Sequence, residues 1–276
     1  MISPIGIFDS GYGGLTIFEK IREAMPAYDF VYLGDNARAP YGPRSFGVVC
    51  EFTKQAVRKL FSLGCPLVVL ACNTASAKAL RTIQREELPC SDDPTRRVLG
   101  VIRPTVEAAD ALSVTKCVGV LGTEGTVSSR SYELEMAKLF PQIRVFSEAC
   151  PMWVPLVENR ETGTPAAEYF VRRHVEALLS RNEKMDTLIL GCTHYPLLLP
   201  LIERFLPAGV RAFPQGACVA ASLKNYLARH SEMERRISRG GSVSFLTTED
   251  AARFSRAAET FLSRAENVRA EHIELG

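Results

Sequence analysis

Two short stretches of this 276-residue sequence end an apolar run on a cysteine and continue with small polar residues. The first reads PLVVLACNTAS over residues 66–76, and the second reads TLILGCTHYP over residues 187–196. A cysteine thiolate can act as a nucleophile, a metal ligand or a base that removes a proton. Cys72 and Cys192 are therefore the first candidates for chemistry, although a buried cysteine can also serve only as a small apolar side chain.

The residues after the first cysteine are suited to binding an anion. Asn73, Thr74 and Ser76 follow Cys72 where a helix is predicted to begin. Their polar groups can cap that helix or bind a negatively charged ligand. We expect the helix dipole at this position to favour the thiolate form of Cys72.

Thr193 and His194 follow the second cysteine in a similar way. Cys192 and His194 form a C-x-H pair, but a zinc site would need a second pair of ligands that the sequence does not offer. A disulfide between Cys72 and Cys192 is disfavoured as a functional state in a reducing compartment. The sequence therefore favours two free thiols and no metal.

Two other apolar stretches also end in polar loops. The stretch IGIF is followed by DSGYGG, and FVYLG is followed by DNARAPYG. Backbone amides and the Ser10 hydroxyl could hold a carboxylate, while Asp9 could hold an ammonium group, orient a neighbour or be purely structural. Tyr41 and Gly42 lie in a loop that nearby prolines stiffen, and packing alone could also explain Tyr41.

Short apolar strands alternate with longer amphipathic segments along the chain, which is typical of βα units and a parallel sheet. Ligands bind beyond the carboxyl ends of the strands in such sheets, and all the polar clusters above fall there. We therefore predict an α/β fold. Strands are expected at 5–9, 29–34, 67–71, 98–102, 117–122, 143–148, 187–191, 210–214 and 243–248. Helices are expected near 45–63, 75–88, 131–140, 165–181, 197–205, 217–229 and 249–264.

A weak internal repeat indicates two related lobes. GIFDSGYGG at 6–14 resembles GVLGTEGTV at 119–127, and a strand that ends in a cysteine follows each of them. The polar segments at 90–97 and 207–216 are typical of crossings between lobes. We predict that residues 1–98 plus 213–276 form one lobe, which carries Cys72, and that residues 99–212 form an inserted lobe, which carries Cys192. The tail from 264 is expected to be surface structure, frayed at its end.

Composition and charge describe an ordinary globular protein. Hydrophobic residues make up 46% of the chain, charged residues 23%, and the net charge is +2. No nucleic-acid partner is expected, because the charged run at 228–241 lacks interleaved aromatic residues. The apolar stretches are far shorter than a bilayer span, so we expect no membrane association and a cytoplasmic location.

Five blocks of the sequence resemble, in order, those of glutamate racemases within the cofactor-independent aspartate/glutamate racemase superfamily. They read IGIFDSGYGGL, YLGDNARAPYGPR, VVLACNTASA, CPMWVPLVE and LILGCTHYPLL, and SFLTTEDAARF at 244–254 resembles the closing strand and helix of that family. The resemblance implies two similar parallel-sheet α/β lobes with the active site at their interface. It also implies glutamate as the substrate, no cofactor or metal, a homodimer, and D-glutamate supplied for peptidoglycan in a bacterial cytoplasm.

The resemblance also assigns roles to individual residues. Cys72 and Cys192 match the two acid/base residues of the family. Asp9, Glu158 and His194 match polar residues that assist the thiols, and we hypothesise that His194 with Glu158 serves Cys192 while Asp9 serves Cys72. The positions that match glutamate-binding residues are Asp9, Ser10, Tyr41, Gly42, Asn73, Thr74, Thr193 and His194. In PQGACVAAS at 214–222 the chain departs from the aspartate and serine more usual in the family, which puts polar contacts from this loop in doubt.

Racemisation needs a base on one face of the substrate α-carbon and an acid on the other, which explains why a strand would deliver a cysteine twice. Aspartate racemase, hydantoin racemase and maleate isomerase of the same superfamily also use paired cysteines and are alternatives. A catalytically silent glutamate-binding protein is another. A cysteine hydrolase would need only one activated thiol and an oxyanion hole, which leaves the second thiol unexplained.

Overall fold

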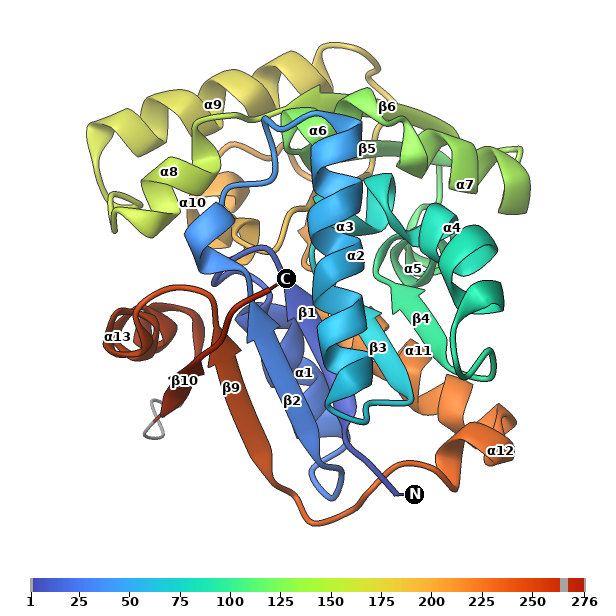
Figure 1. Ribbon diagram of the computed structural model, residues 1–276. Coiled ribbons are helices and arrows are strands. Elements are labelled where there is room, and N and C mark those ends of the chain that lie inside the picture. The colour runs from blue at the N-terminus through green and yellow to red at the C-terminus, as the bar shows by residue number, and fades with distance from the viewer. Residues whose placement is uncertain (1, 264–267, 276) are drawn as a thin grey trace.

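The computed structural model describes residues 2–263 and 268–275, and these contain two parallel β-sheets with helices packed on both faces (Figure 1). The strands are β1 (Ile5–Asp9), β2 (Phe30–Gly34), β3 (Leu67–Leu70), β4 (Arg97–Gly100), β5 (Cys117–Gly122), β6 (Arg144–Ala149), β7 (Thr187–Gly191), β8 (Arg211–Phe213), β9 (Val243–Thr247) and β10 (Ala270–His272). One sheet has the order β10-β9-β2-β1-β3-β4 and the other β6-β5-β7-β8. The predicted α/β fold of two parallel-sheet lobes is confirmed.

The helices form the outer layers of both lobes. The longer ones are α1 (Leu15–Ala24), α2 (Phe46–Ser62), α5 (Ile102–Leu112), α7 (Ser131–Leu139), α9 (Pro165–Leu179), α11 (Gly216–Arg229) and α13 (Ala251–Phe261). The short ones are α3 (Asn73–Lys78), α4 (Leu80–Thr82), α6 (Glu124–Ser128), α8 (Trp153–Glu158), α10 (Leu199–Glu203) and α12 (Ser231–Glu234).

The central strands are apolar along their whole length because helices cover both of their faces. In β1, Ile5 and Ile7 pack into the same core as α1, α11 and α13, while Phe8 packs on the opposite face with α2. The side-chain direction alternates along a strand, so one short run such as IGIF supplies two cores. In the second sheet, Val118 packs towards α5 and α7, and Leu190 packs towards α9.

The two sheets repeat one topology. The order β2-β1-β3-β4 in the first sheet corresponds to β6-β5-β7-β8 in the second. The equivalent register pairs are Gly6 with Val68 and Gly119 with Leu188. Cys72 lies four residues after Val68, and Cys192 lies four residues after Leu188. The weak sequence echo therefore reflects two equivalent βα frameworks, each ending in a thiol.

All nine predicted strands are present, with ends that shift by at most two residues. Helices α1 and α5 were not predicted, although both bury an apolar face. The predicted helix at 75–88 is interrupted at Ala79, where φ is −120°, and continues as shorter turns up to Cys90. In the tail, Ala270–His272 forms β10, which pairs with β9, so this part extends the sheet. The expected fraying at residue 276 lies outside the described residues.

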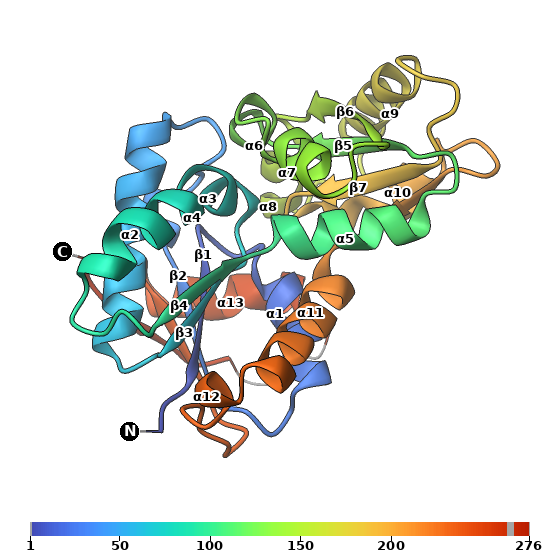
Figure 2. The same cartoon turned by 90° about the vertical axis from the view of Figure 1, so that its right-hand side faces the viewer.

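The chain crosses between the sheets twice. The first crossing leads from β4 into α5, so the prediction that 90–97 is a crossing was wrong, because β4 pairs with β3 in the first sheet. The second leads from β8 into α11. Figure 2 shows α5 and α11 at the junction of the two lobes, where they contact each other. In each crossing, the strand and the helix that it connects therefore belong to different lobes.

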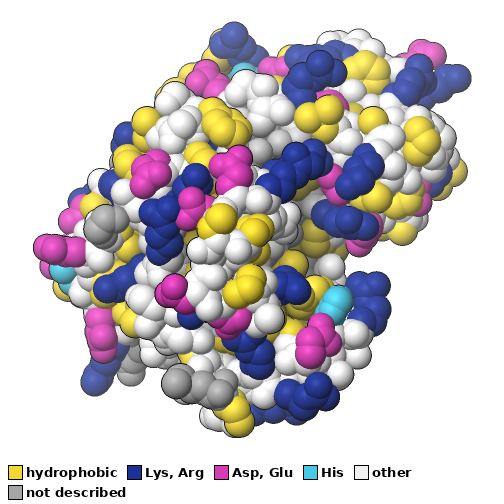
Figure 3. Space-filling model, turned by 45° about the vertical axis from the view of Figure 1, so that its right-hand side comes forward, with side chains coloured by type: hydrophobic (Ala, Val, Ile, Leu, Met, Phe, Trp, Pro, Cys, Tyr) yellow, Lys and Arg dark blue, Asp and Glu magenta, His cyan; other side chains and the backbone are white. Residues whose placement is uncertain are grey.

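Charged side chains of both signs are spread over the visible surface in Figure 3. On the face seen in Figure 3, basic and acidic side chains are interspersed over both lobes. Within the described residues, no helix combines the length and apolar character needed to cross a membrane.

Candidate active site

A narrow cavity at the carboxyl ends of the strands receives residues from both lobes. Its volume is about 30 Å³, and Cys72 and Cys192 are only 5% and 7% exposed there. The lining residues are Ser10, Gly11, Ala39, Pro40, Tyr41, Gly42, Cys72, Asn73, Thr74, Thr123, Val154, Glu158, Cys192, Thr193 and His194. The structure thus brings together the site residues predicted from the sequence except Asp9 and Ser76. The Ser76 hydroxyl donates a hydrogen bond to the Leu70 carbonyl at 2.9 Å and does not line the cavity.

Cys72 is held as a protonated thiol. Its Sγ accepts a hydrogen bond from the Ala75 amide at 3.4 Å and lies 3.3 Å from the Ser10 hydroxyl. Burial, and next the Asp9 charge, raise the pKa of Cys72 to about 12, and the contacts with Ser10 and Ala75 offset only part of the rise. The Ala75 amide at the helix end favours the thiolate, as expected, but the desolvation of a buried thiolate outweighs this effect.

Cys192 lies beside a charged pair. His194 Nδ1 is 3.9 Å from Cys192 Sγ, and His194 Nε2 is 2.9 Å from Glu158 Oε1. Burial lowers the pKa of His194, but its contacts with Cys192 and Glu158 outweigh this effect and raise the pKa to about 10. The imidazole is therefore protonated at neutral pH, and its positive charge lies beside the Cys192 sulfur.

Asp9 is buried behind the cavity wall. Its Oδ2 accepts a hydrogen bond from the Gly11 amide at 2.9 Å. Burial raises the pKa of Asp9, and the charge of His194 and the amides of Gly11 and Gly14 counter the rise in part. The polar group that touches Cys72 is the Ser10 hydroxyl, so Asp9 acts on that thiol through its charge rather than by contact.

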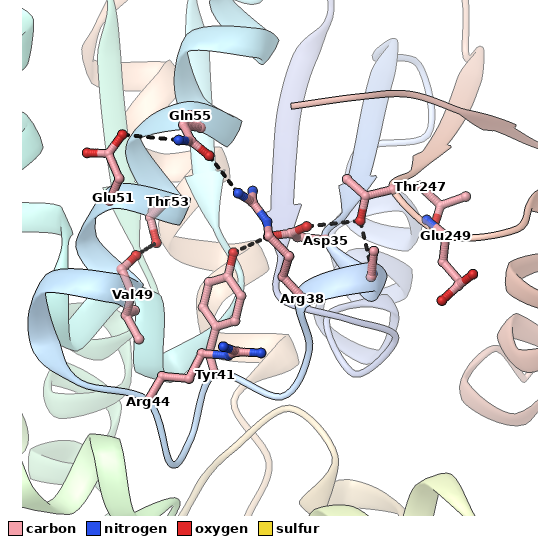
Figure 4. Close-up of polar contacts among 12 residues, drawn as sticks. Asp35, Arg38, Tyr41, Arg44, Val49, Glu51, Thr53, Gln55, Thr247 and Glu249 are labelled. Carbon is pink, nitrogen blue, oxygen red and sulfur yellow. Dashed lines mark hydrogen bonds and ion pairs between the residues drawn. The ribbon is translucent and has the colours of Figure 1, made fainter. Parts of the chain in front are cut away.

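The loop that carries Tyr41 and Gly42 is anchored through the Tyr41 side chain, which points to Asp35 (Figure 4). The Tyr41 hydroxyl donates a hydrogen bond to Asp35, a buried carboxylate that also accepts from Arg38 Nε at 2.7 Å and from Thr248 Oγ1 at 2.9 Å. Burial, and then the adjacent charge of Asp35, raise the pKa of Tyr41. Because its hydroxyl is engaged, Tyr41 contributes its ring and backbone to the cavity.

Hydroxyl groups connect the lobes next to Cys72. The Thr74 hydroxyl lies 2.9 Å from that of Thr123, which stands at the end of β5 in the second lobe. The sequence analysis missed Thr123, although the echo GVLGTEGTV places it at a strand end. Asn73 forms side-chain hydrogen bonds with Gln215, so the doubt about polar contacts from loop 214–222 was unfounded.

The glycine-rich loop after β1 fits closely against the loop after β7. A Cβ atom at Gly13 would lie 2.3 Å from Thr193 Oγ1 and 2.4 Å from His194 Nδ1. The Thr16 hydroxyl also donates a hydrogen bond to the Thr193 carbonyl at 2.9 Å. Position 13 therefore requires glycine for close backbone approach between the lobes, a role that the sequence pattern left open.

Larger hollows lie elsewhere on the surface formed by the described residues. One of about 580 Å³ includes Arg81, Glu135 and Tyr226, and one of about 520 Å³ includes Lys54 and Glu87. Neither contains a pair of buried thiols, so the narrow cavity is the candidate site in spite of its size. No set of three or more His, Cys, Asp or Glu side chains in residues 2–263 and 268–275 is placed to hold a metal ion.

Comparisons with known proteins agree with this geometry. Residues 5–223 match the family model described as Asp/Glu/Hydantoin racemase. A glutamate racemase of Roseobacter denitrificans is 42% identical over 271 residues, which cover 94% of this chain and 97% of that protein. The crystal structure of glutamate racemase isoform RacE1 from Bacillus anthracis has a TM-score of 0.88 and 33% identity, covering 99% of this chain and 98% of that one. The structure of glutamate racemase from Francisella tularensis in complex with D-glutamate has a TM-score of 0.86 and 30% identity, with the same coverage. With two thiols at equivalent strand ends and these relatives spanning nearly its whole length, this chain belongs to the Asp/Glu/hydantoin racemase family.

Proposed function

We propose that this protein interconverts L- and D-glutamate by moving a proton across the substrate α-carbon between Cys72 and Cys192. The observation that carries the proposal is that both sulfurs line one cavity, from equivalent positions of two related lobes. The choice of glutamate is supported by relatives at about 40% identity that are named glutamate racemase. Racemases of aspartate or a related amino acid are the alternative within the family.

The proton balance needs one thiolate and one thiol. A thiolate on one face of the α-carbon takes its hydrogen as a proton, and the C–H electron pair stays on the substrate as a carbanion. The thiol on the other face donates its own proton to that carbon, which restores the C–H bond with inverted configuration. The two sulfurs have then exchanged protonation states.

The environments of the two sulfurs suit one to the thiol role and the other to the thiolate role. The raised pKa of Cys72 keeps it a proton donor, and we propose that Cys192, which lies beside protonated His194, is the sulfur that takes the proton from the substrate. Glu158 accepts a hydrogen bond from His194 Nε2 and so keeps the imidazolium oriented. We propose that Asp9 adds charge behind Cys72 that holds its proton in place.

The carbanion is stabilised when its charge spreads into the α-carboxylate. Ser10, Asn73, Thr74 and Thr193 line the cavity and supply the hydroxyl, side-chain and backbone groups that we propose bind the two carboxylates of glutamate. Gly42 lets the loop after Tyr41 approach Thr123 closely. These groups need no metal or organic cofactor to act on the substrate.

Substrate entry requires the lobes to separate. The cavity of about 30 Å³ is far smaller than the roughly 300 Å³ at the lower end of small-molecule pockets. We propose that the two lobes move as two bodies, one formed by the chain up to β4 and again from α11 onwards and the other by the chain from α5 to β8. The movement breaks the contact of Thr74 with Thr123. Closure then excludes water from the thiols and strengthens the hydrogen bonds to the carbanion.

The cellular assignment follows from the proposed reaction. D-Glutamate is the product expected to serve peptidoglycan synthesis and thereby cell-wall biogenesis and cell shape, which places the enzyme in a bacterial cytoplasm. We also propose a homodimer, as in the family. Gel filtration with light scattering measures the oligomeric state directly.

The experiment that tests the function compares D-glutamate and D-aspartate in deuterium oxide, following optical rotation and deuterium at the α-carbon. We expect racemisation of glutamate with one solvent deuterium incorporated at each inverted centre. Exclusive turnover of aspartate would overturn the substrate. Tight glutamate binding without exchange would overturn catalysis and identify a silent binding protein.

A further inference from the structure

The side chain of Gln215 completes a buried ring of hydrogen bonds beside the cavity. Its Oε1 accepts from Asn73 Nδ2 at 2.9 Å, and its Nε2 donates to Asn73 Oδ1 at 3.1 Å. Its Nε2 also donates to the Tyr132 hydroxyl, which in turn donates to Asn73 Oδ1 at 2.7 Å. Gln215 is 1% exposed, Tyr132 1% and Asn73 2%, so water does not compete for these groups.

The ring joins three separate parts of the fold. Asn73 is the first residue of α3 and directly follows Cys72 in the first lobe. Tyr132 lies on α7 in the second lobe, and Gln215 lies between β8 and α11, where the chain crosses back to the first lobe. Cys72, the proposed proton donor, directly precedes Asn73 in the chain, so the ring holds the residue next to the thiol.

The chemistry of the ring requires the glutamine amide. Its oxygen accepts a hydrogen bond from Asn73 Nδ2, and its two N–H groups donate to Asn73 Oδ1 and to the Tyr132 hydroxyl. A serine at position 215 would be too short to span both partners, and an ionised aspartate would have no hydrogen to donate. The side-chain oxygen and nitrogen of Asn73 are therefore held in one orientation, and one N–H of its Nδ2 is left for a ligand.

We propose that Gln215 is a positioning residue, which with Tyr132 fixes the Asn73 amide and the Cys72 turn in the closed arrangement of the lobes. It touches neither sulfur and acts through Asn73. The kinetic part of this inference rests on the proposed racemase function, but the positioning of Cys72 can be measured without any substrate.

The test uses Gln215→Met, which keeps the length of the side chain and removes all three hydrogen bonds. We expect iodoacetamide to alkylate Cys72 at least about fivefold faster than in the parent, because the turn leaves its buried position more often. Labelling of buried Cys65, located by peptide mass spectrometry, should stay unchanged. With D-glutamate, kcat should fall at least about tenfold while KM stays within about threefold, since misplacement affects the reacting geometry more than binding.

The matched control is Thr53→Val, which removes a buried hydroxyl hydrogen bond within α2, away from the cavity. It should lower the melting temperature without changing kcat or the labelling of Cys72. Gln215→Met labelling within twofold of the parent would overturn the inference, and so would an unchanged kcat in an active parent. A parent that does not racemise glutamate would refute the proposed function, and the labelling rate alone would then decide the role of Gln215.

Tyr132→Phe provides a second, milder variant if Gln215→Met does not fold. It removes one hydroxyl and both of its hydrogen bonds in the ring. We expect Cys72 to be labelled faster and kcat to fall, as for Gln215→Met. The double variant should be no worse than Gln215→Met alone, because both substitutions break one ring. Independent, additive effects on kcat and labelling would overturn the proposed coupling.

Discussion

His194 Nε2 lies 2.9 Å from Glu158 Oε1, and this contact ties the loop after β7 to the end of α8 within the second lobe. It places a carboxylate behind the imidazole that faces Cys192. Since Glu158 helps to hold the pKa of His194 at about 10, the pair determines the charge beside one of the two thiols.

Glu158→Gln is predicted to change how stability depends on pH. The folded-state pKa of His194, about 10, lies above its ordinary value of 6.5, so the folded protein binds more protons between these values. This stabilisation is complete below pH 6.5 and is lost as the pH rises through 10. Glu158→Gln lowers the pKa of His194, so its free energy of unfolding should fall less steeply with pH over this window. Urea unfolding at several pH values measures the slopes.

The raised pKa of Cys72 also makes the protein less stable at alkaline pH, but it should contribute alike in parent and variant. Glu161→Gln, an exposed change three residues further on, serves as the control and should keep the parent slope. Equal slopes for the parent and Glu158→Gln would contradict the role of Glu158.

Cys72→Ala and Cys192→Ala are predicted to separate proton exchange from inversion. Each variant keeps one sulfur, which can remove and return a proton on one face only. Racemisation should fall by about 10³-fold or more, since the missing acid or base is worth roughly 10² to 10⁴ in rate. In deuterium oxide, the two variants should exchange the α-hydrogen of opposite enantiomers, as followed by NMR. Because the pKa of Cys72 is raised to about 12, exchange by Cys192→Ala should be slow at neutral pH and should grow as the pH rises towards that value. Exchange of the same enantiomer by both variants would rule out opposed thiols.

Gly13→Ala is predicted to prevent full closure. The added methyl would lie 2.3 Å from Thr193 Oγ1 and 2.4 Å from His194 Nδ1, so the two loops must move apart. We expect kcat to fall by about 10²-fold, because water enters and the geometry loosens. The control is Gly47→Ala, in α2, where the Cβ meets nothing within 4 Å. It should raise the free energy of unfolding by about 0.5 to 1 kcal/mol and leave kcat alone. Parent-like kcat in Gly13→Ala would show that this contact does not limit closure.

Asp35→Asn is predicted to loosen the loop that carries Tyr41. The fully buried carboxylate accepts hydrogen bonds from Tyr41, Arg38 and Thr248, and an amide can replace only part of this capacity. Denaturant unfolding should show a loss of about 1 to 3 kcal/mol. We expect the KM for glutamate to rise more than kcat falls, because we propose that this loop, which lines the cavity, binds substrate and moves no proton. Asp92→Asn, at an exposed site, should stay within about 0.5 kcal/mol of the parent.

Sequence patterns were sufficient for the α/β class, for the nine predicted strands and for the positions of the two cysteines that follow β3 and β7. The apolar runs that end at Asp9, Gly34, Leu70 and Gly191 predicted buried parallel strands, because only strands covered on both faces have such continuous apolar sequence. The carboxyl ends of parallel strands lie at one edge of the sheet. The residues that follow these strands therefore lie close together, regardless of the path that the connecting segments take. This local rule predicted that Ser10, Tyr41, Thr74 and Thr193 would gather around the cysteines.

Only the tertiary structure decided how these side chains are used. Asp9 lies behind the wall and Asn73 is held by Gln215 and Tyr132, because burial and hydrogen-bond partners come from segments distant in the sequence. The protonation of Cys72 was decided in the same way, since desolvation depends on all the atoms that cover the sulfur, whereas the sequence shows only the helix that follows it.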